Sequence, residues 1–292
     1  MAESLRILRL SGSPPTLRRG TRLDQYRLQK QLGEGGFASV YSAYDQSTRR
    51  HVALKIPHTH GSSGQTAEDI QREVDLMADL EHPGVLRLIE AREIRGHFVI
   101  AFPLGEESLA ERLGRRMGRA TAIKLIYQMV SAVAFAHENQ ILHRDIKPEN
   151  LILFPENRVC LTDFGLARVE SGDHYDSASG TLGYIAAEQA MGKPTFRSDV
   201  FSLGLVIYRM LSGALPEYPF LPPLPEYNKL RRGISRDLVA LIRKAIDPDP
   251  KKRFRDAVAM NNALLRIRSP LTERPNVTSG TAGKATTRRR VA

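Results

Sequence analysis

The feature that most constrains the fold is a change in the spacing of apolar residues part-way along the chain. Residues 26–56 contain short alternating or apolar runs broken by glycine-rich and polar turns, a pattern typical of three antiparallel strands. Two further strand-like runs follow at 85–94 and 97–102. From residue 107 onward, apolar residues recur at helical spacing. The sequence therefore predicts an α+β fold with a small strand-rich N-terminal lobe and a larger, mainly helical C-terminal lobe.

One long helix is predicted inside the strand-rich part, over residues 66–80. Ile70, Val74 and Met77 recur at positions i, i+4 and i+7, which places them on one face that the helix would bury. Glu73 lies at the polar edge of this face. The pattern therefore predicts a carboxylate beside the core of the N-terminal lobe.

Positive charge is concentrated at the two ends of the chain, whose net charge is +11. Residues 1–25 hold five arginines against two acidic residues, and residues 269–292 hold five Lys or Arg against one acidic residue. Ser, Pro and Arg are frequent in the first segment and large apolar residues are few in the second, so we expect a disordered basic leader and tail. The predicted domain covers 26–268, with lobes over about 26–102 and about 105–268.

Composition excludes several classes of protein. The chain has no run of about 18 apolar residues, so no membrane span is expected. Cys160 is the only cysteine, which rules out an internal disulfide and fits a reducing, cytoplasmic location. Residues 287–290 could dock on nucleic acid, but no recognition helix or stacking motif accompanies them. A solubilising tail is therefore favoured over nucleic-acid binding.

A glycine-rich turn lies between the first two predicted strands. It contains Gly33, Glu34, Gly35 and Gly36, whose backbone N–H groups could contact phosphates because glycine permits a close approach. A glycine-rich hairpin alone is more often a plain tight turn. The turn therefore needs other residues around it before it indicates a site.

Lys55 lies at an inward-facing position of an apolar strand, in the sequence VALK. A lone lysine at such a position usually extends toward solvent, and a buried one needs an anionic partner. Glu73 on the predicted helix can supply that partner. We therefore expect an ion pair between Lys55 and Glu73.

Ionisable residues also crowd into the segment ILHRDIKPENLILF at residues 141–154. Asp145, Lys147 and Asn150 lie there between apolar runs, and Asp163 follows another apolar run in LTDFG. Burying such groups is costly unless they are paired. A nucleotide with its metal ion would complete the electrostatics of such a cluster.

Taken in order along the chain, these motifs resemble those of the eukaryotic-type (Hanks-type) serine/threonine protein kinase family. The resemblance covers about residues 26–268 and rests on GEGGFASV, VALK, Glu73, HRDIKPEN, DFG, GTLGYIAAE, SDVFSLG and DPKKRF. It implies a bilobal kinase fold that transfers the γ-phosphoryl group of ATP to Ser or Thr hydroxyls of protein substrates. It also implies autophosphorylation of the activation loop, with ATP and Mg²⁺ as cofactors and Mn²⁺ as a substitute for Mg²⁺.

The resemblance assigns catalytic roles residue by residue. Lys55 would hold the α- and β-phosphates while paired with Glu73. Asp145 would orient the substrate hydroxyl and accept its proton, and Lys147 would reach the γ-phosphate. These roles suit phosphoryl transfer, in which catalysis is mostly positioning and charge neutralisation. The implied ligands of magnesium, which prefers oxygen donors, are Asn150 and Asp163.

The resemblance also implies a nucleotide site between the lobes. The carbonyl of Phe102 and the amide of Leu104 would bind the adenine edge, and Ala101 would control access to the space behind it. The implied nucleotide contacts are Gly33, Glu34, Gly35, Gly36, Val40, Ala53, Lys55, Glu73, Phe102, Leu104, Asn150, Leu153 and Asp163.

Lys147 is typical of the serine/threonine class, because tyrosine kinases usually carry Ala and Arg where this chain has Lys147 and Glu149. Thr181 occupies the position of a threonine that bridges the catalytic aspartate and lysine in such kinases. The resemblance further implies a structural ion pair between Glu188 and Arg253.

Three positions depart from the family pattern without removing a catalytic group. Ala38 replaces the third glycine of the family's glycine-rich turn. Ala187 replaces the proline that usually precedes the residue corresponding to Glu188, and Leu182 replaces a proline that is frequent at its position. Asp199 keeps its usual residue type and would tie the catalytic loop to a buried helix.

Regulation is implied by Arg144, which directly precedes the catalytic aspartate. In this family an arginine there often contacts a phosphate on the activation loop. Ser177 is the first candidate for that phosphate and Ser179 the second, because a phosphate adds about −1.5 to −2 charge and can order the loop. The alternative is that Arg144 pairs with Asp173 or Asp176.

Three other functions stay open on the sequence. A pseudokinase scaffold would share the fold but carry out no reaction, although the five catalytic-type residues are all present. A small-molecule phosphotransferase would share the nucleotide site without needing Thr181, Glu188 and Arg253. A nucleic-acid-binding protein would depend on the basic tail and ranks last.

Overall fold

The computed structural model describes residues 17–36, 38–58, 66–164 and 182–271. In its N-terminal part, short turns between successive strands produce a six-stranded sheet in the order β1-β2-β3-β4-β6-β5, with antiparallel pairing throughout. The predicted strands are confirmed, except that the run predicted over 85–94 is a strand only from Glu90 to Ile94, and a short additional strand precedes them all. The strands are β1 (Arg22–Leu23), β2 (Tyr26–Glu34), β3 (Ala38–Asp45), β4 (Arg50–Pro57), β5 (Glu90–Ile94) and β6 (His97–Pro103).

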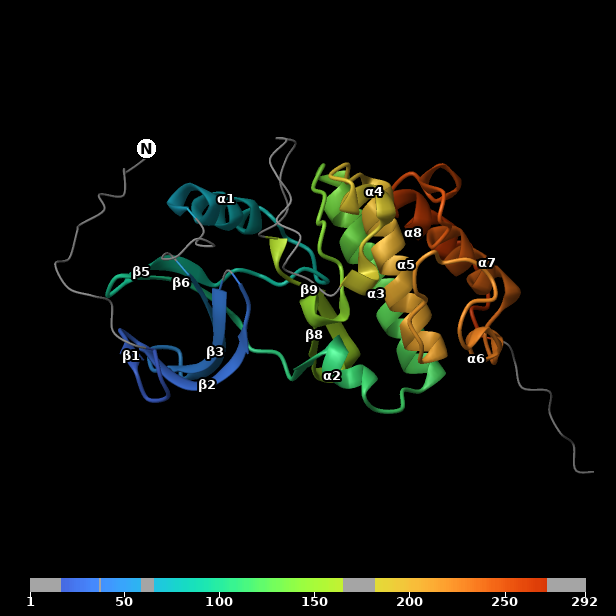
Figure 1. The fold of residues 1–292 in the computed structure, drawn as a ribbon. Helices are drawn as coiled ribbons and strands as arrows, with labels where there is room; N and C mark the ends of the chain where they lie inside the picture. Colours follow the sequence, from blue (N-terminus) through green and yellow to red (C-terminus); the bar gives the residue numbers. More distant parts are fainter. Residues whose placement is uncertain (1–16, 37, 59–65, 165–181, 272–292) are drawn as a thin grey trace, which may run out of the picture.

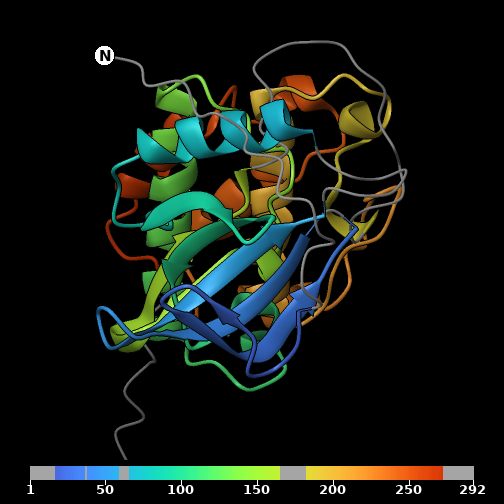
Figure 2. The same cartoon turned by 90° about the vertical axis from the view of Figure 1, so that its left-hand side faces the viewer.

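Helix α1 (Ala67–Ala78) lies across one face of this sheet (Figure 2). Ile70 and Met77 are buried and Val74 is half-buried, which confirms the apolar stripe that the sequence predicts. Glu73 is also buried, although it carries a carboxylate. The helix therefore presents one acidic side chain to the interior together with its apolar face.

The helical lobe lies beside the sheet, and a small sheet of three strands occupies the side of this lobe that faces it (Figure 1). The small sheet joins the N-terminal lobe through a bridge between Val85 and Leu161. Its strands are β7 (Glu107–Ser108), β8 (Leu151–Phe154) and β9 (Arg158–Leu161). The helices are α2 (Leu109–Leu113), α3 (Arg119–Glu138), α4 (Ala187–Ala190), α5 (Phe196–Ser212), α6 (Tyr227–Arg231), α7 (Arg236–Ala245) and α8 (Ala257–Leu265).

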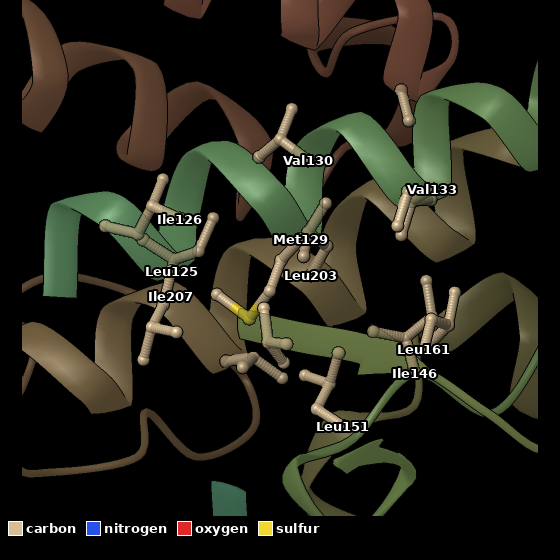
Figure 3. Packing of buried hydrophobic residues seen from close by; sticks show 14 of the residues in the cluster. Leu125, Ile126, Met129, Val130, Val133, Ile146, Leu151, Leu161, Leu203 and Ile207 are labelled. Carbon is tan, nitrogen blue, oxygen red and sulfur yellow. The ribbon is translucent and has the colours of Figure 1, made fainter. Parts of the chain in front are cut away.

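The core of the helical lobe forms around α3 and α5. Helix α5 is apolar around most of its circumference, so it is buried on nearly every side. Figure 3 shows Leu125 and Met129 of α3 meeting Leu203 and Ile207 of α5 and Leu151 of β8 in one cluster. This packing holds β8 and β9 in place, together with the loop of Asp145 before β8 and the segment of Asp163 after β9. No described helix is long and apolar enough to cross a membrane.

The folded part extends beyond both predicted boundaries. Residues 17–25, which we expected in the disordered leader, include β1, and Leu23 is fully buried while Leu17 packs on the same cluster. At the other end, Leu271 forms a bridge with Ile234. Single apolar residues anchor these ends, so ordered structure continues on both sides of the segment 26–268, whose bounds as the kinase-type domain stay a prediction. Residues 1–16 and 272–292 lie outside the described residues.

Gly105, which links the two lobes, has no room for a side chain. A Cβ there would clash with Cγ2 of Ile152 and would lie 2.9 Å from the backbone oxygen of Leu153. We expect Gly105→Ala to lower the free energy of unfolding by about 1–3 kcal/mol, because the backbone must move to relieve the overlap. Urea unfolding measures this change. Gly118→Ala is the control, since no atom lies within 4 Å of its added Cβ; an equal loss in both variants would contradict the prediction.

Candidate active site

Lys55 joins three elements of the fold at one point. Strand β4 carries Lys55, helix α1 carries Glu73, and Asp163 follows β9. The Nζ atom of Lys55 donates to Oε1 of Glu73 at 2.6 Å and to Oδ1 of Asp163 at 2.9 Å. The side chains of Lys55 and Glu73 are 14% and 4% exposed, so this pair is largely shielded from water. The predicted ion pair between Lys55 and Glu73 is confirmed.

The electrostatics of this group favour its charged form. Burial alone would lower the pKa of the Lys55 ammonium, but the carboxylates of Asp163 and Glu73 outweigh burial and raise that pKa above its ordinary value. The nearby Lys55 charge lowers the pKa of the Asp163 carboxyl, although burial opposes it. Lys55 and Asp163 are therefore both ionised at neutral pH, as a site for phosphate and a cation requires.

Asp145, Lys147 and Asn150 form a second polar group in the loop before β8. Lys147 Nζ donates to Oδ2 of Asp145 at 2.7 Å. Asn150 lies in the short 3₁₀ turn Pro148–Asn150, and its Nδ2 donates to the backbone oxygen of Asp145 at 2.8 Å and to Oδ2 of Asp145 at 2.9 Å. The aspartate carboxylate is thereby held in one orientation by two neighbours from its own loop.

The two polar groups are neighbours. The backbone N–H of Thr162, which directly precedes Asp163, donates to the backbone oxygen of Asn150 at 3.0 Å. Asn150 uses its Nδ2 on Asp145, so its amide oxygen remains the atom suited to a cation. The oxygens of Asn150 and Asp163 fit a hard divalent cation by chemistry. Among the described residues, no cluster of three or more His, Cys, Asp or Glu could hold a metal.

A buried carboxylate on helix α5 anchors the loop that carries Asp145. The Asp199 side chain accepts the backbone N–H of His143 at 2.7 Å and that of Arg144 at 2.9 Å. Asp199 is fully buried, so these bonds are shielded from competing water. The role expected for Asp199 in tying this loop to a buried helix is therefore confirmed.

His143 is a residue that the sequence reading did not single out. Its Nε2 lies 3.0 Å from the backbone oxygen of Thr162, and its ring meets Phe164 edge-on at 4.8 Å between centroids. His143 thus links the segment before Asp145 to the segment around Asp163. The only sequence feature that could have indicated its role is its position two residues before Asp145, in the motif HRD.

The strand register decides which side chains face Lys55. Ala53 pairs with Phe102 and Lys55 pairs with Ile100 across β4 and β6, so these four side chains share one face of the sheet. Ala101 pairs with Leu54 and packs in the cluster on the opposite face. The expectation that Ala101 borders the space behind the adenine is therefore wrong. Phe102 places its side chain, rather than the carbonyl that we assigned to adenine, on the face of Lys55.

The other predicted nucleotide contacts lie around the same face. Val40 of β3 pairs with Lys55 on one side and with Gly33 on the other. The glycine-rich turn is closed by a hydrogen bond from the N–H of Gly35 to the oxygen of Ala38, at 2.9 Å. Leu153 of β8 is buried in the cluster that also contains Phe102.

Several predicted residues are not part of this site or cannot be placed. Glu188 and Arg253 form the predicted ion pair at 2.7 Å, away from the polar groups above. Ser177, Ser179 and Thr181 lie outside the described residues, as do Asp173 and Asp176. The role of Arg144 as a phosphate contact therefore stays a prediction.

The comparison with family models decides the assignment, because the protein kinase domain model matches residues 26–264. The chain belongs to the protein kinase family. The match spans both lobes of the kinase domain and includes Lys55, Glu73, Asp145, Asn150 and Asp163.

Curated kinases are similar over most of this kinase chain. The serine/threonine-protein kinase pkn2 of Myxococcus xanthus is 34% identical over 274 residues, which are 85% of this chain and 33% of pkn2. The putative CBL-interacting protein kinase 27 of Oryza sativa subsp. japonica is 33% identical over 90% of this chain and 69% of its own length. This chain thus spans only a third of pkn2.

Solved kinase structures share the fold. The crystal structure of the Mycobacterium tuberculosis PknI kinase domain matches with a TM-score of 0.64 and 22% identity. The match covers 86% of this chain and 99% of the PknI chain. The bilobal kinase fold that the sequence predicts is therefore confirmed.

Proposed function

We propose that this chain is a serine/threonine protein kinase that transfers the γ-phosphoryl group of ATP, with Mg²⁺, to hydroxyls of protein substrates. The single observation that carries the proposal is the bridge that Lys55 makes between Glu73 and Asp163. This bridge joins the helix of one lobe to the cation-binding segment of the other, beside the loop of Asp145. A pseudokinase scaffold would not need all of these groups together.

The residues of the chain would position the reactants and neutralise charge. Lys55 would hold the α- and β-phosphates, and Lys147 would approach the γ-phosphate from its place 2.7 Å from Asp145. Asp145 would accept a hydrogen bond from the substrate hydroxyl and then its proton. Asn150 and Asp163 would hold Mg²⁺, or Mn²⁺ in its place, which supplies positive charge to the phosphate oxygens when bound.

The adenine contacts need one change from the sequence prediction. The Ala101 carbonyl accepts the N–H of Ile89 on the β5 side of β6. Because successive carbonyls alternate in direction along a strand, the Phe102 carbonyl points to β4 and the Pro103 carbonyl points away from it. We infer that adenine contacts the backbone of residues 103–105, with the Leu104 amide among the candidates, while Phe102 contributes its side chain.

The class of acceptor and the regulation are also proposals. The lysine beside Asp145 favours Ser and Thr over Tyr as acceptors, by resemblance to the family. Autophosphorylation at Ser177 or Ser179, with the phosphate bound by Arg144, remains the proposed regulation. By resemblance to the family, Thr181 would bridge the catalytic aspartate and lysine. A reducing, cytoplasmic location fits the lone buried Cys160. Nucleic acid ranks last as a partner, because no recognition helix or stacking motif accompanies the basic residues 287–290.

The proposed function is tested with the purified chain of residues 1–292 and [γ-³²P]ATP. We expect metal-dependent labelling of serine and threonine in a generic protein substrate and in the chain itself, and no labelling in EDTA. Acid hydrolysis of the labelled proteins separates phosphoserine and phosphothreonine from phosphotyrosine. Labelling of a small alcohol without protein labelling would favour a small-molecule phosphotransferase, and no ATP turnover at all would favour a scaffold.

A further inference from the structure

His58 lies one residue beyond the end of β4 and three residues after Lys55. Its ring reaches back over the start of β3. The Nε2 atom lies 2.9 Å from Oγ of Ser39, and Nδ1 lies 3.4 Å from the backbone oxygen of Gly36. One imidazole therefore contacts two residues of the segment that follows Gly35.

The chemistry of these partners fixes how the ring is used. The Gly36 carbonyl can only accept, so Nδ1 must carry the proton that it shares with that oxygen. In the neutral ring, Nε2 then accepts the hydroxyl proton of Ser39. In the protonated ring, Nε2–H donates to the same hydroxyl oxygen. Both contacts are available in both protonation states, although the 3.4 Å contact is the weaker one.

Ser39 lies in β3, between two neighbouring strands. It pairs with Glu34 of β2 on one side and with Ile56 of β4 on the other. Its side chain is buried in spite of its hydroxyl. The contact from His58 therefore ties the glycine-rich turn between β2 and β3 to the strand that carries Lys55.

We propose that His58 is a positioning residue that holds the glycine-rich turn in register with Lys55, so that the backbone N–H groups of the turn meet the phosphates of ATP. The proposal rests on the proposed function of the chain. It also accounts for Ala38 at the third glycine position, because the His58 side chain, from the residue after β4, holds the turn by an additional contact.

The first test replaces the ring by His58→Ala in the full chain. We expect KM for ATP to rise about three- to tenfold while kcat stays within about twofold, because hydrogen bonds of this kind contribute modestly and act on binding of the nucleotide. Ser39→Ala should give a similar rise. The double variant should be no worse than His58→Ala, since that change already removes the contact that Ser39→Ala removes.

Two further variants separate positioning from general damage to the sheet. His51→Ala is the matched control, because His51 lies near the other end of β4 and its Nδ1 lies 3.1 Å from Oε1 of Gln29, away from the glycine-rich turn. We expect no change in KM for this variant. His58→Gln should restore most of the affinity, because its side-chain amide can occupy the place of Nε2.

A second readout does not depend on turnover. Hydrogen–deuterium exchange in the peptide that joins β2 to β3 should be faster in His58→Ala than in wild type, and unchanged in His51→Ala. If wild type shows no turnover, the proposed function fails, and this exchange together with affinity for methylanthraniloyl-ATP still decides the role of His58. An unchanged affinity for ATP in a folded His58→Ala variant overturns the proposal.

Discussion

Asp145→Asn is expected to lower kcat by about 10²–10⁴-fold while the fold and the affinity for Mg-ATP are retained. The replacement has nearly the same shape, so Lys147 and Asn150 can keep contacts close to the observed 2.7 Å and 2.9 Å. A neutral amide, however, cannot accept the proton of a substrate hydroxyl. The initial rate of ADP release measures kcat, and calorimetry measures the affinity for Mg-ATP.

Asp237→Asn provides the control for this experiment, because Asp237 is an exposed acid in the first turn of α7. It should change kcat less than twofold. If Asp145→Asn kept kcat within threefold of wild type, Asp145 would not be the proton acceptor. A loss of Mg-ATP affinity in the same variant would instead indicate that Asp145 shapes the nucleotide site.

Glu188→Ala is expected to lower the free energy of unfolding by about 3–5 kcal/mol, because it leaves a buried guanidinium without its carboxylate. The Arg253 side chain is 1% exposed, and Glu188 is 17% exposed. Burial lowers the pKa of Arg253, and the Glu188 carboxylate opposes that effect. Backbone carbonyls of Asp247 and Pro248 also accept from Arg253 but cannot neutralise its charge.

Urea unfolding followed by circular dichroism measures this loss. Lys229→Ala is the control, since Lys229 and Glu226 form a pair whose side chains are 60% and 45% exposed. An exposed pair contributes at most about 1 kcal/mol. Equal destabilisation by the two variants would show that burial does not set the strength of the Glu188–Arg253 pair.

The sequence was sufficient to predict the ion pair of Lys55 and Glu73. An inward lysine in an apolar strand requires an acid, and the helix offered Glu73 at the edge of its buried stripe. Buried charges leave few arrangements that are stable. The catalytic and magnesium-binding roles of the site, in contrast, came from the resemblance to the kinase family.

The register of the strands could not be predicted in the same way. Ala101 and Phe102 are neighbours of similar apolar character, and a slip of one residue exchanges the faces of the sheet. Only the pairing with Ala53 and Leu54 decides that Phe102 faces the site. The contact of His58 was also missed, because its partner Ser39 lies 19 residues earlier in the sequence, in β3.

Short elements at the ends of the domain were missed as well. Strand β1 has two residues and therefore no periodicity to detect. Helix α8 did carry a signal, because Asp256 caps its first turn and Ala257, Met260 and Leu264 are buried on one side. Its low content of charged residues makes this pattern hard to distinguish from an ordinary apolar run.

The carboxylate of Asp199 has a practical consequence for anyone who shortens this chain. Besides the two loop amides, Asp199 Oδ2 lies 3.0 Å from Nε2 of His137, and Nδ1 of the same imidazole accepts the backbone N–H of Ala257 at 2.9 Å. The start of α8 is thus linked to the loop that carries Asp145 through the imidazole ring of His137. A deletion that removes Ala257–Leu265 is expected to yield an inactive fragment, so expression boundaries belong downstream of that helix.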